Sequence, residues 1–184
     1  MGVASRRGIG PLVAGLLALA LAGCGSGITA GGLGPTPPDA AKPLSEPTTA
    51  MAATLTALQA ALAVGGDRVA LAGQPYRPSE PASFVRVPRI VYRVDLADPN
   101  DGILLIYEFT DAAGAAAGAN TLAGYLGSGS GQTNFPGDTI FSVSYLGPTV
   151  TLSWFAASRS DDPVAGRGAF DLIATVGTQV RVIK

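Results

Sequence analysis

Few side chains in this chain of 184 residues could carry out catalytic chemistry. Cys24 is the only thiol, the sequence contains no histidine, and its two lysines are Lys42 and Lys184. The chain therefore has no histidine-based triad, no histidine or cysteine metal cluster and no internal disulfide. A nucleophilic serine would also lack an imidazole base. We expect no catalytic residues, no metal site and no cofactor, and a formal net charge of −1 argues against nucleic acid as a partner.

The N-terminal segment has the pattern of a secretory signal. Arg6 and Arg7 are the only charges before Asp39, and an apolar run of 14 residues follows over 9–22. A membrane-spanning helix needs about 20 apolar residues, so this run is short for a permanent span. A basic start and a short apolar centre are typical of a signal peptide. The pair of arginines also resembles a twin-arginine signal, so general secretory (Sec) export and twin-arginine export both stay open.

The single cysteine follows this run at the position where processing would occur. Leu21, Ala22 and Gly23 precede Cys24 and resemble the lipobox of bacterial lipoproteins. The resemblance implies cleavage before Cys24 and lipidation of its thiol and new amino terminus. Two or more acyl chains give stable anchoring without a spanning helix. We therefore predict an extracytoplasmic protein, lipid-anchored to the cell membrane through Cys24, with residues 1–23 as its signal peptide.

Composition divides the remaining chain into a tether and a domain. Of the 23 residues over 25–47, 10 are glycine or proline, and large apolar side chains are almost absent. Such a segment buries too little surface to repay the entropy of ordering. We predict the lipidated cysteine and a flexible tether over 24–47 and a single domain over 48–184, which is long enough for one core.

Hydrophobic periodicity and turn residues predict two similar halves in this domain. In the first half, a helix capped by Thr48 or Thr49 precedes a strand over 84–96, bent at Pro88, and a central strand over 103–109. In the second half, a helix capped by Thr110 or Asp111 precedes a hairpin over 139–145 and 149–156. A helix capped by Asp162 and a short edge strand over 179–183 follow. The order αββ-αββ-α predicts an α+β fold, an antiparallel sheet of about four strands with helices on one face.

These elements resemble a group of uncharacterised small bacterial lipoproteins. The matching stretches are Leu58 to Asp67, Phe84 to Pro88, Tyr107-Glu108-Phe109 with the following Thr110-Asp111-Ala112-Ala113, Thr149 to Phe155, and Asp161 to Gly177. Where that group often has Trp-x-x-Pro-Pro, this chain has Ser142-Val143-Ser144. The resemblance implies an anchored lipoprotein with one α+β domain and assigns no site residues.

Four side chains are candidates for contact with a ligand or partner. Arg86, Arg89 and Arg93 lie near one end of the first strand and could bind a carboxylate or phosphate. The alternative is a solvated strand face neutralised by nearby acids. Phe155 points away from the core face of its strand, which suggests either a partner contact or a site covered by the last helix.

Two polar groupings have simpler explanations than a site. Asp95, Asp98, Asn100 and Asp101 supply oxygens around one turn, but their spacing differs from a calcium-binding loop and suits a hairpin turn. The hydroxyls of Ser142, Ser144, Thr149, Thr151 and Ser153 share one hairpin face, which could bind a glycan or strand or simply face solvent.

Together these observations predict a non-enzymatic binding or envelope-accessory module, anchored to a membrane, with an envelope protein or small ligand as its partner. Two alternatives stay open. One is a carboxylate-based hydrolase of envelope polymers, which needs two facing acids in a cleft. The other is an inhibitor-like module, suggested only by the order of the elements.

Overall fold

A computed structural model describes residues 40–72, 79–94 and 102–184. The helices and strands in chain order are α1 (Thr49–Leu62), β1 (Val69–Leu71), β2 (Arg89–Val94), β3 (Ile103–Glu108), α2 (Ala112–Gly127), α3 (Gly129–Gln132), β4 (Ile140–Leu146), β5 (Thr149–Phe155), α4 (Pro163–Ile173) and β6 (Thr178–Val180). Short 3₁₀ helices occur at Ala82–Phe84 and Ala157–Arg159. The α+β class is confirmed.

All six strands form one antiparallel sheet in the order β1-β2-β3-β5-β4-β6. The prediction of about four strands and the plain αββ-αββ-α order is wrong in detail, because three-residue strands extend both edges. β1 lies between the first predicted helix and the predicted strand over 84–96, and its three residues are too few to show a period. β6 is the predicted edge strand, formed slightly earlier and paired with β4.

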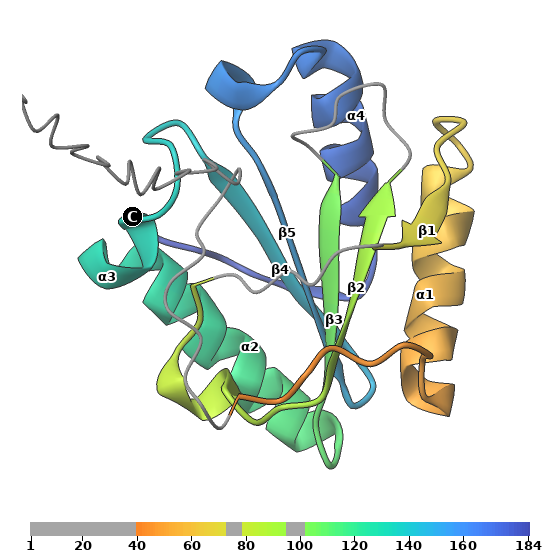
Figure 1. Cartoon of the computed structure of the whole chain (residues 1–184), viewed down its shortest axis with the longest axis vertical. Helices are drawn as coiled ribbons and strands as arrows, with labels where there is room; N and C mark the ends of the chain where they lie inside the picture. The colour runs from red at the N-terminus through yellow and green to blue at the C-terminus, as the bar shows by residue number, and fades with distance from the viewer. Residues whose placement is uncertain (1–39, 73–78, 95–101) are drawn as a thin grey trace, which may run out of the picture.

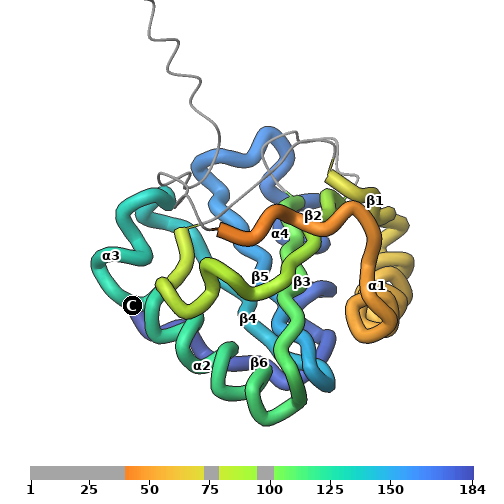
Figure 2. Tube along the Cα trace, turned by 60° about the horizontal axis from the view of Figure 1, so that its bottom comes forward, coloured from red at the N-terminus to blue at the C-terminus, as the bar shows by residue number. Residues whose placement is uncertain are grey.

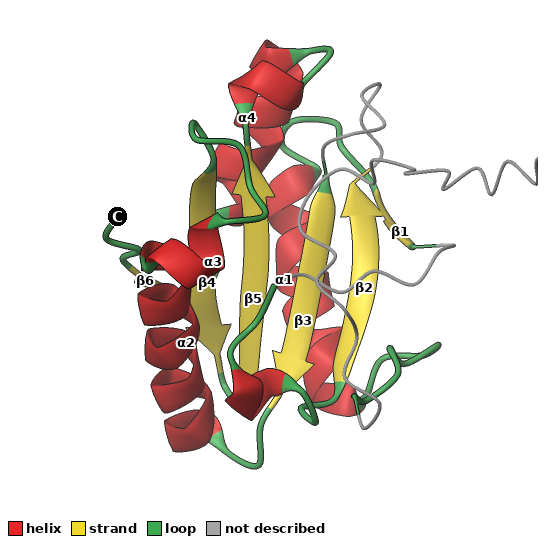
Figure 3. Cartoon of the chain, turned by 60° about the vertical axis from the view of Figure 1, so that its left-hand side comes forward, coloured by secondary structure: helices red, strands yellow, loops and turns green. Residues whose placement is uncertain are grey.

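Helices cover both faces of the sheet, so the prediction of helices on one face is also wrong. α2 lies against one face, and α1 and α4 lie against the other (Figures 1 and 3). The central strand β3 explains this, because it is apolar on both sides. Leu105 and Tyr107 belong to the core under α2, whereas Leu104 and Ile106 belong to the core under α1 and α4. Each apolar face needs a layer that excludes water.

Local signals place the three long helices where the sequence predicts them. The Thr48 side chain accepts a hydrogen bond from the amide of Met51. Asp111 caps α2, and Asp162 caps α4 with Pro163 in its first turn. Each cap satisfies an amide that has no partner within its helix. The apolar stripe of α1, with Leu58 and Leu62 fully buried, then faces the sheet.

The predicted first strand is shorter than expected at its start. Residues 84–88 form the end of a 3₁₀ helix and a turn, and β2 begins only at Arg89. Phe84 is buried against Tyr107, with ring centroids 4.9 Å apart in an edge-to-face arrangement. This segment therefore covers a part of the sheet that α2 does not reach.

Residues 40–47, which we name the N-terminal strap, lie against the domain. Figure 2 shows the strap in orange, running past β2 to α1. The amide of Ala41 donates to the carbonyl of Val85 at 2.9 Å, and that of Leu44 donates to the carbonyl of Arg89 at 2.8 Å. Leu44 also packs against the core under α1. The last part of the predicted tether is thus in contact with the sheet.

Candidate functional site

The structure does not bring the three predicted arginines together on one open surface. Arg89 is only 2% exposed, and its Nη1 donates to the carbonyl of Ala41 at 2.9 Å. Arg86 is exposed in the turn before β2, and Arg93 is partly buried within β2. The guanidinium of Arg89 therefore serves the chain's own strap, and contact of Arg86 or Arg93 with a ligand stays a prediction.

The hydroxyl face of the β4–β5 hairpin is buried, which contradicts its expected exposure to solvent. Its members are Ser142, Ser144, Thr149, Thr151 and Ser153, each between 0 and 4% exposed. α4 and α1 cover this part of the sheet, and β6 flanks it. Thr54 of α1 reaches the hydroxyl of Thr149 at 2.7 Å. A glycan or added strand therefore cannot reach this face while the helices stay in place.

Phe155 ends β5 and lies under α4. Its side chain is 6% exposed, and its ring centroid is 6.4 Å from that of Phe170. The expected covering by the last helix is therefore confirmed. A role for Phe155 in contacting a partner stays a prediction, now limited to a place where α4 and β5 meet.

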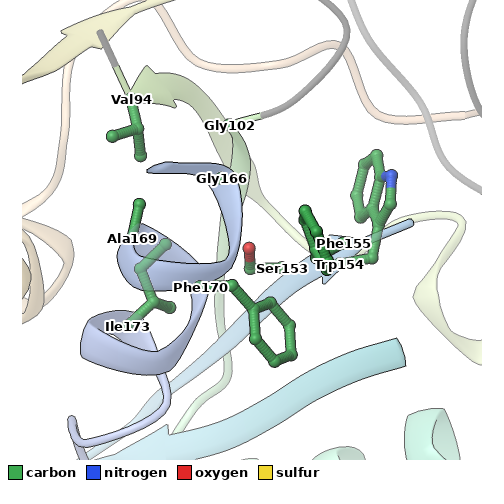
Figure 4. A pocket seen from close by; sticks show the side chains of 9 residues that line it. All are labelled: Val94, Gly102, Ser153, Trp154, Phe155, Gly166, Ala169, Phe170 and Ile173. Atoms are coloured by element: carbon green, nitrogen blue, oxygen red, sulfur yellow. The ribbon is translucent and has the colours of Figure 1, made fainter. Parts of the chain in front are cut away.

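A small pocket lies at this junction, at the end of the sheet where β2 and β5 finish. We call this end the upper end, since it is uppermost in Figure 1. The pocket's cavity volume is about 10 Å³, which is room for roughly one water molecule. Its lining residues are Val94, Gly102, Ser153, Trp154, Phe155, Gly166, Ala169, Phe170 and Ile173 (Figure 4).

The lining limits what the pocket can do chemically. Its walls are aliphatic and aromatic, and the Ser153 hydroxyl is the one polar side-chain atom that points toward α4 in Figure 4. None of the nine lining residues has a carboxylate, amine, thiol or imidazole. The lining thus supplies no general base for Ser153 and no pair of facing acids. The pocket has room for about one water molecule, so it is far smaller than an ordinary ligand pocket.

The sequence analysis did not identify this pocket. It forms because Gly166 and Ala169, three residues apart on α4, present small side chains toward the sheet. Small residues three positions apart lie on one helix face, and this spacing is the sequence signal that could have pointed to the pocket. The strand partners come from three separate segments, so the pocket itself depends on tertiary structure.

The core under α1 and α4 also holds a buried tyrosine hydroxyl. Tyr92 is 4% exposed, and its hydroxyl has no hydrogen-bond partner among the described residues. Burial raises the pKa of Tyr92 above its ordinary value. This tyrosine shares a row across the sheet with Leu104 and Ser153, so two polar side chains flank an apolar one on this face.

Neither a metal cluster nor a membrane span occurs in the described part of the chain. The acidic turn of Asp95, Asp98, Asn100 and Asp101 lies outside the described residues. Within residues 40–72, 79–94 and 102–184, no three acidic or cysteine side chains gather as metal ligands. No helix in the same ranges is both long and apolar enough to cross a bilayer.

Comparison with known proteins adds no relative to this picture. Neither a family model, nor a curated protein, nor a solved structure matches the chain. The resemblance to small bacterial lipoproteins therefore stays a prediction that rests on the residues themselves.

Proposed function

We propose that this chain is an extracytoplasmic lipoprotein, held on a cell membrane through Cys24, whose domain is a non-enzymatic binding or envelope-accessory module. One observation carries the proposal. The only cysteine of the chain directly follows Leu21, Ala22 and Gly23, after a basic start and an apolar run. A lone thiol elsewhere would carry no such meaning, because the pattern depends on what precedes it.

The parts of the domain that the helices do not cover support the proposed binding role. Helices cover both sheet faces, so a ligand would bind at the ends of the sheet. The upper end has the apolar pocket beside Ser153 and Phe155. Its lining supplies no base and no paired acids, which favours binding over hydrolysis, and a ligand larger than a water molecule would need the site to widen. Capture of neither a specific protein nor a specific small molecule from cell envelopes would contradict this half.

The anchor is tested by Cys24→Ala in the full chain. The variant can accept no thioether-linked lipid, so it should either appear in the soluble fraction or keep its signal segment uncleaved. Cell fractionation measures the first outcome, and intact mass measures the second and detects acyl chains. Ser26→Ala is the matched control, because it changes a small residue two positions away and should keep wild-type retention. Unchanged membrane retention of a processed Cys24→Ala protein would exclude the lipid anchor.

A further inference from the structure

Arg89 is the one charged side chain that is buried within the described ranges, with 2% of its surface exposed. Its Nη1 donates to the carbonyl of Ala41 at 2.9 Å, but its Nε is buried without a hydrogen-bond partner. No acid in the described part of the chain forms an ion pair with it. A buried guanidinium is costly unless a counter-charge and hydrogen bonds replace its water. Arg89 is therefore incompletely compensated, which calls for a physical explanation.

The guanidinium lies between the sheet and two segments that cover it. Arg89 of β2 is paired with Tyr107 of β3, and Tyr107 belongs to the core under α2, so both side chains lie on that face. The segment 79–88 covers Tyr107, whose hydroxyl donates to Glu80 at 3.0 Å. The strap is the second cover, through Ala41. Glu80 thus adds a negative charge to this layer but forms no ion pair with Arg89.

Few interactions hold the strap in place. The amide of Ala41 donates to the carbonyl of Val85. The amide of Leu44 donates to the carbonyl of Arg89. Leu44 makes apolar contact with the core, yet none of the residues over 40–47 is buried. Segments with few buried contacts open locally at a fraction of the global free energy of unfolding, so opening of the strap exposes Arg89 while the sheet stays folded.

The chemistry of Arg89 selects the ligand that would replace the strap. Once Ala41 leaves, Nη1 and Nε are both available as donors. A guanidinium binds a planar carboxylate through two parallel N–H···O bonds, which also supply the missing counter-charge. One positive charge matches one carboxylate, and the carboxylate of Glu80 in the same layer disfavours a more highly charged phosphate.

We propose that Arg89 is a carboxylate-binding site that the N-terminal strap closes, with the Ala41 carbonyl in the place of one ligand oxygen. The site lies where β2 begins, at the end of the sheet opposite the pocket beside Phe155, and Figure 2 shows the strap crossing it. The inference rests on the proposed binding role and gives it a ligand class. It does not depend on the anchor at Cys24.

Hydrogen exchange of the full chain in neutral detergent tests the closure, with acetate as the probe and chloride at equal ionic strength as the reference. Acetate bound to the open form multiplies the open population by 1 + [L]/Kd. At twice the Kd of the open form, exchange at the amides of Ala41 and Leu44 should therefore rise about threefold. The Ala72 amide is the matched control, because it donates to Val91 on the same edge of β2 and should not change.

Variants test the site itself through acetate affinity, measured by calorimetry. Leu44→Ser removes the apolar contact of the strap and should tighten acetate binding about threefold or more, because a larger fraction of the protein is open. Arg89→Gln should abolish saturable binding, and Arg89→Lys should weaken it because the planar fork is lost. Lys42→Gln removes an exposed cation from the strap and should leave the affinity within about twofold.

Each part of the inference has an outcome that overturns it. Equal exchange at Ala41 and Leu44 in acetate and chloride would overturn the closure, and this measurement needs no variant if Arg89→Gln fails to fold. Equal affinity in wild type and a folded Arg89→Gln would overturn the site. Tighter binding of inorganic phosphate than of acetate would overturn the carboxylate class.

Capture from cell envelopes separates these outcomes from failure of the proposed function. A specific partner or ligand that Arg89→Gln captures as well as wild type does would preserve the binding role and overturn only this site. Capture of nothing specific by either protein would contradict the binding role itself.

Discussion

Both faces of the sheet are buried, but the side chains that they bury differ in chemistry. Under α2, the contacts are apolar and aromatic, with Phe135 edge-to-face against Phe141 and Trp154. Under α1 and α4, only the β2–β3 half is apolar, and the β4–β5 half is lined by serine and threonine hydroxyls. Close packing stabilises the face under α2. The stability of the face under α1 and α4 also depends on which hydroxyls form hydrogen bonds.

The largest effect should come from disturbing the fit under α2. A Cβ atom at Gly118 would lie 2.4 Å from Cζ of Phe109, whose ring packs on Phe84. We expect Gly118→Ala to lower the free energy of unfolding by about 1–3 kcal/mol, because the ring must leave its packed position. Chemical denaturation followed by circular dichroism measures this loss.

Gly124 is the control in the same helix. Nothing lies within 4 Å of its added Cβ, so Gly124→Ala should stabilise by about 0.5–1 kcal/mol through helix propensity. Similar effects at the two glycines would show that packing against Phe109 does not matter.

A moderate effect is expected on the hydroxyl half of the other face. Thr54 reaches the Thr149 hydroxyl, which donates to the carbonyl of Leu146 at 2.8 Å. Thr149→Val removes this link between α1 and β5 and should cost about 1–2 kcal/mol, because the Thr54 hydroxyl stays buried.

Thr151→Val is the matched control on the same strand. Thr151 is 2% exposed and makes no hydrogen bond through its hydroxyl within the described ranges. Its replacement should change the free energy of unfolding by less than about 0.5 kcal/mol, since a partnerless hydroxyl is exchanged for a methyl. Equal losses in both variants would mean that hydroxyl partners do not distinguish this face.

The smallest effect should be a gain at Tyr92. Tyr92→Phe removes a buried hydroxyl that has no partner in the described structure and should stabilise by about 0.5–1 kcal/mol at neutral pH. Burial raises the Tyr92 pKa, so the folded protein holds this proton more tightly than the unfolded chain does. The protein therefore loses stability as pH rises from the unfolded pKa of about 10 through the folded pKa, and no such loss occurs below the unfolded pKa. Denaturation at neutral and alkaline pH should therefore show a shallower alkaline loss in Tyr92→Phe. A steeper loss would contradict the assignment.

Local sequence signals predicted the helices and the central strands well. Caps such as Asp111 and Asp162 act within three residues, and the apolar character of β3 marks a central strand wherever it is placed. Leu152 and Trp154 of β5 lie two residues apart and belong to one core, as the period of a strand requires. These features depend on neighbours in sequence, so they can be recognised without a structure.

What could not be predicted depends on contacts between distant segments. The pattern of β4 and β5 resembles a half-exposed hairpin, because nothing local shows that α4 will fold back over Ser153. By composition the strap resembles a free tether. It lies against the domain because it is hydrogen-bonded to Arg89, nearly 50 residues away. Assigning Arg89 to a ligand failed to anticipate this contact for the same reason.

The short outer strands have a consequence for copies of the protein that meet one another. β1 and β6 contribute only three residues each, and the outer side of β2 beyond β1 is occupied by Ala72 and Leu44, which donate to its carbonyls. Exposed sheet edges are templates for pairing between molecules and for aggregation. Short edges leave little backbone for a second copy to extend.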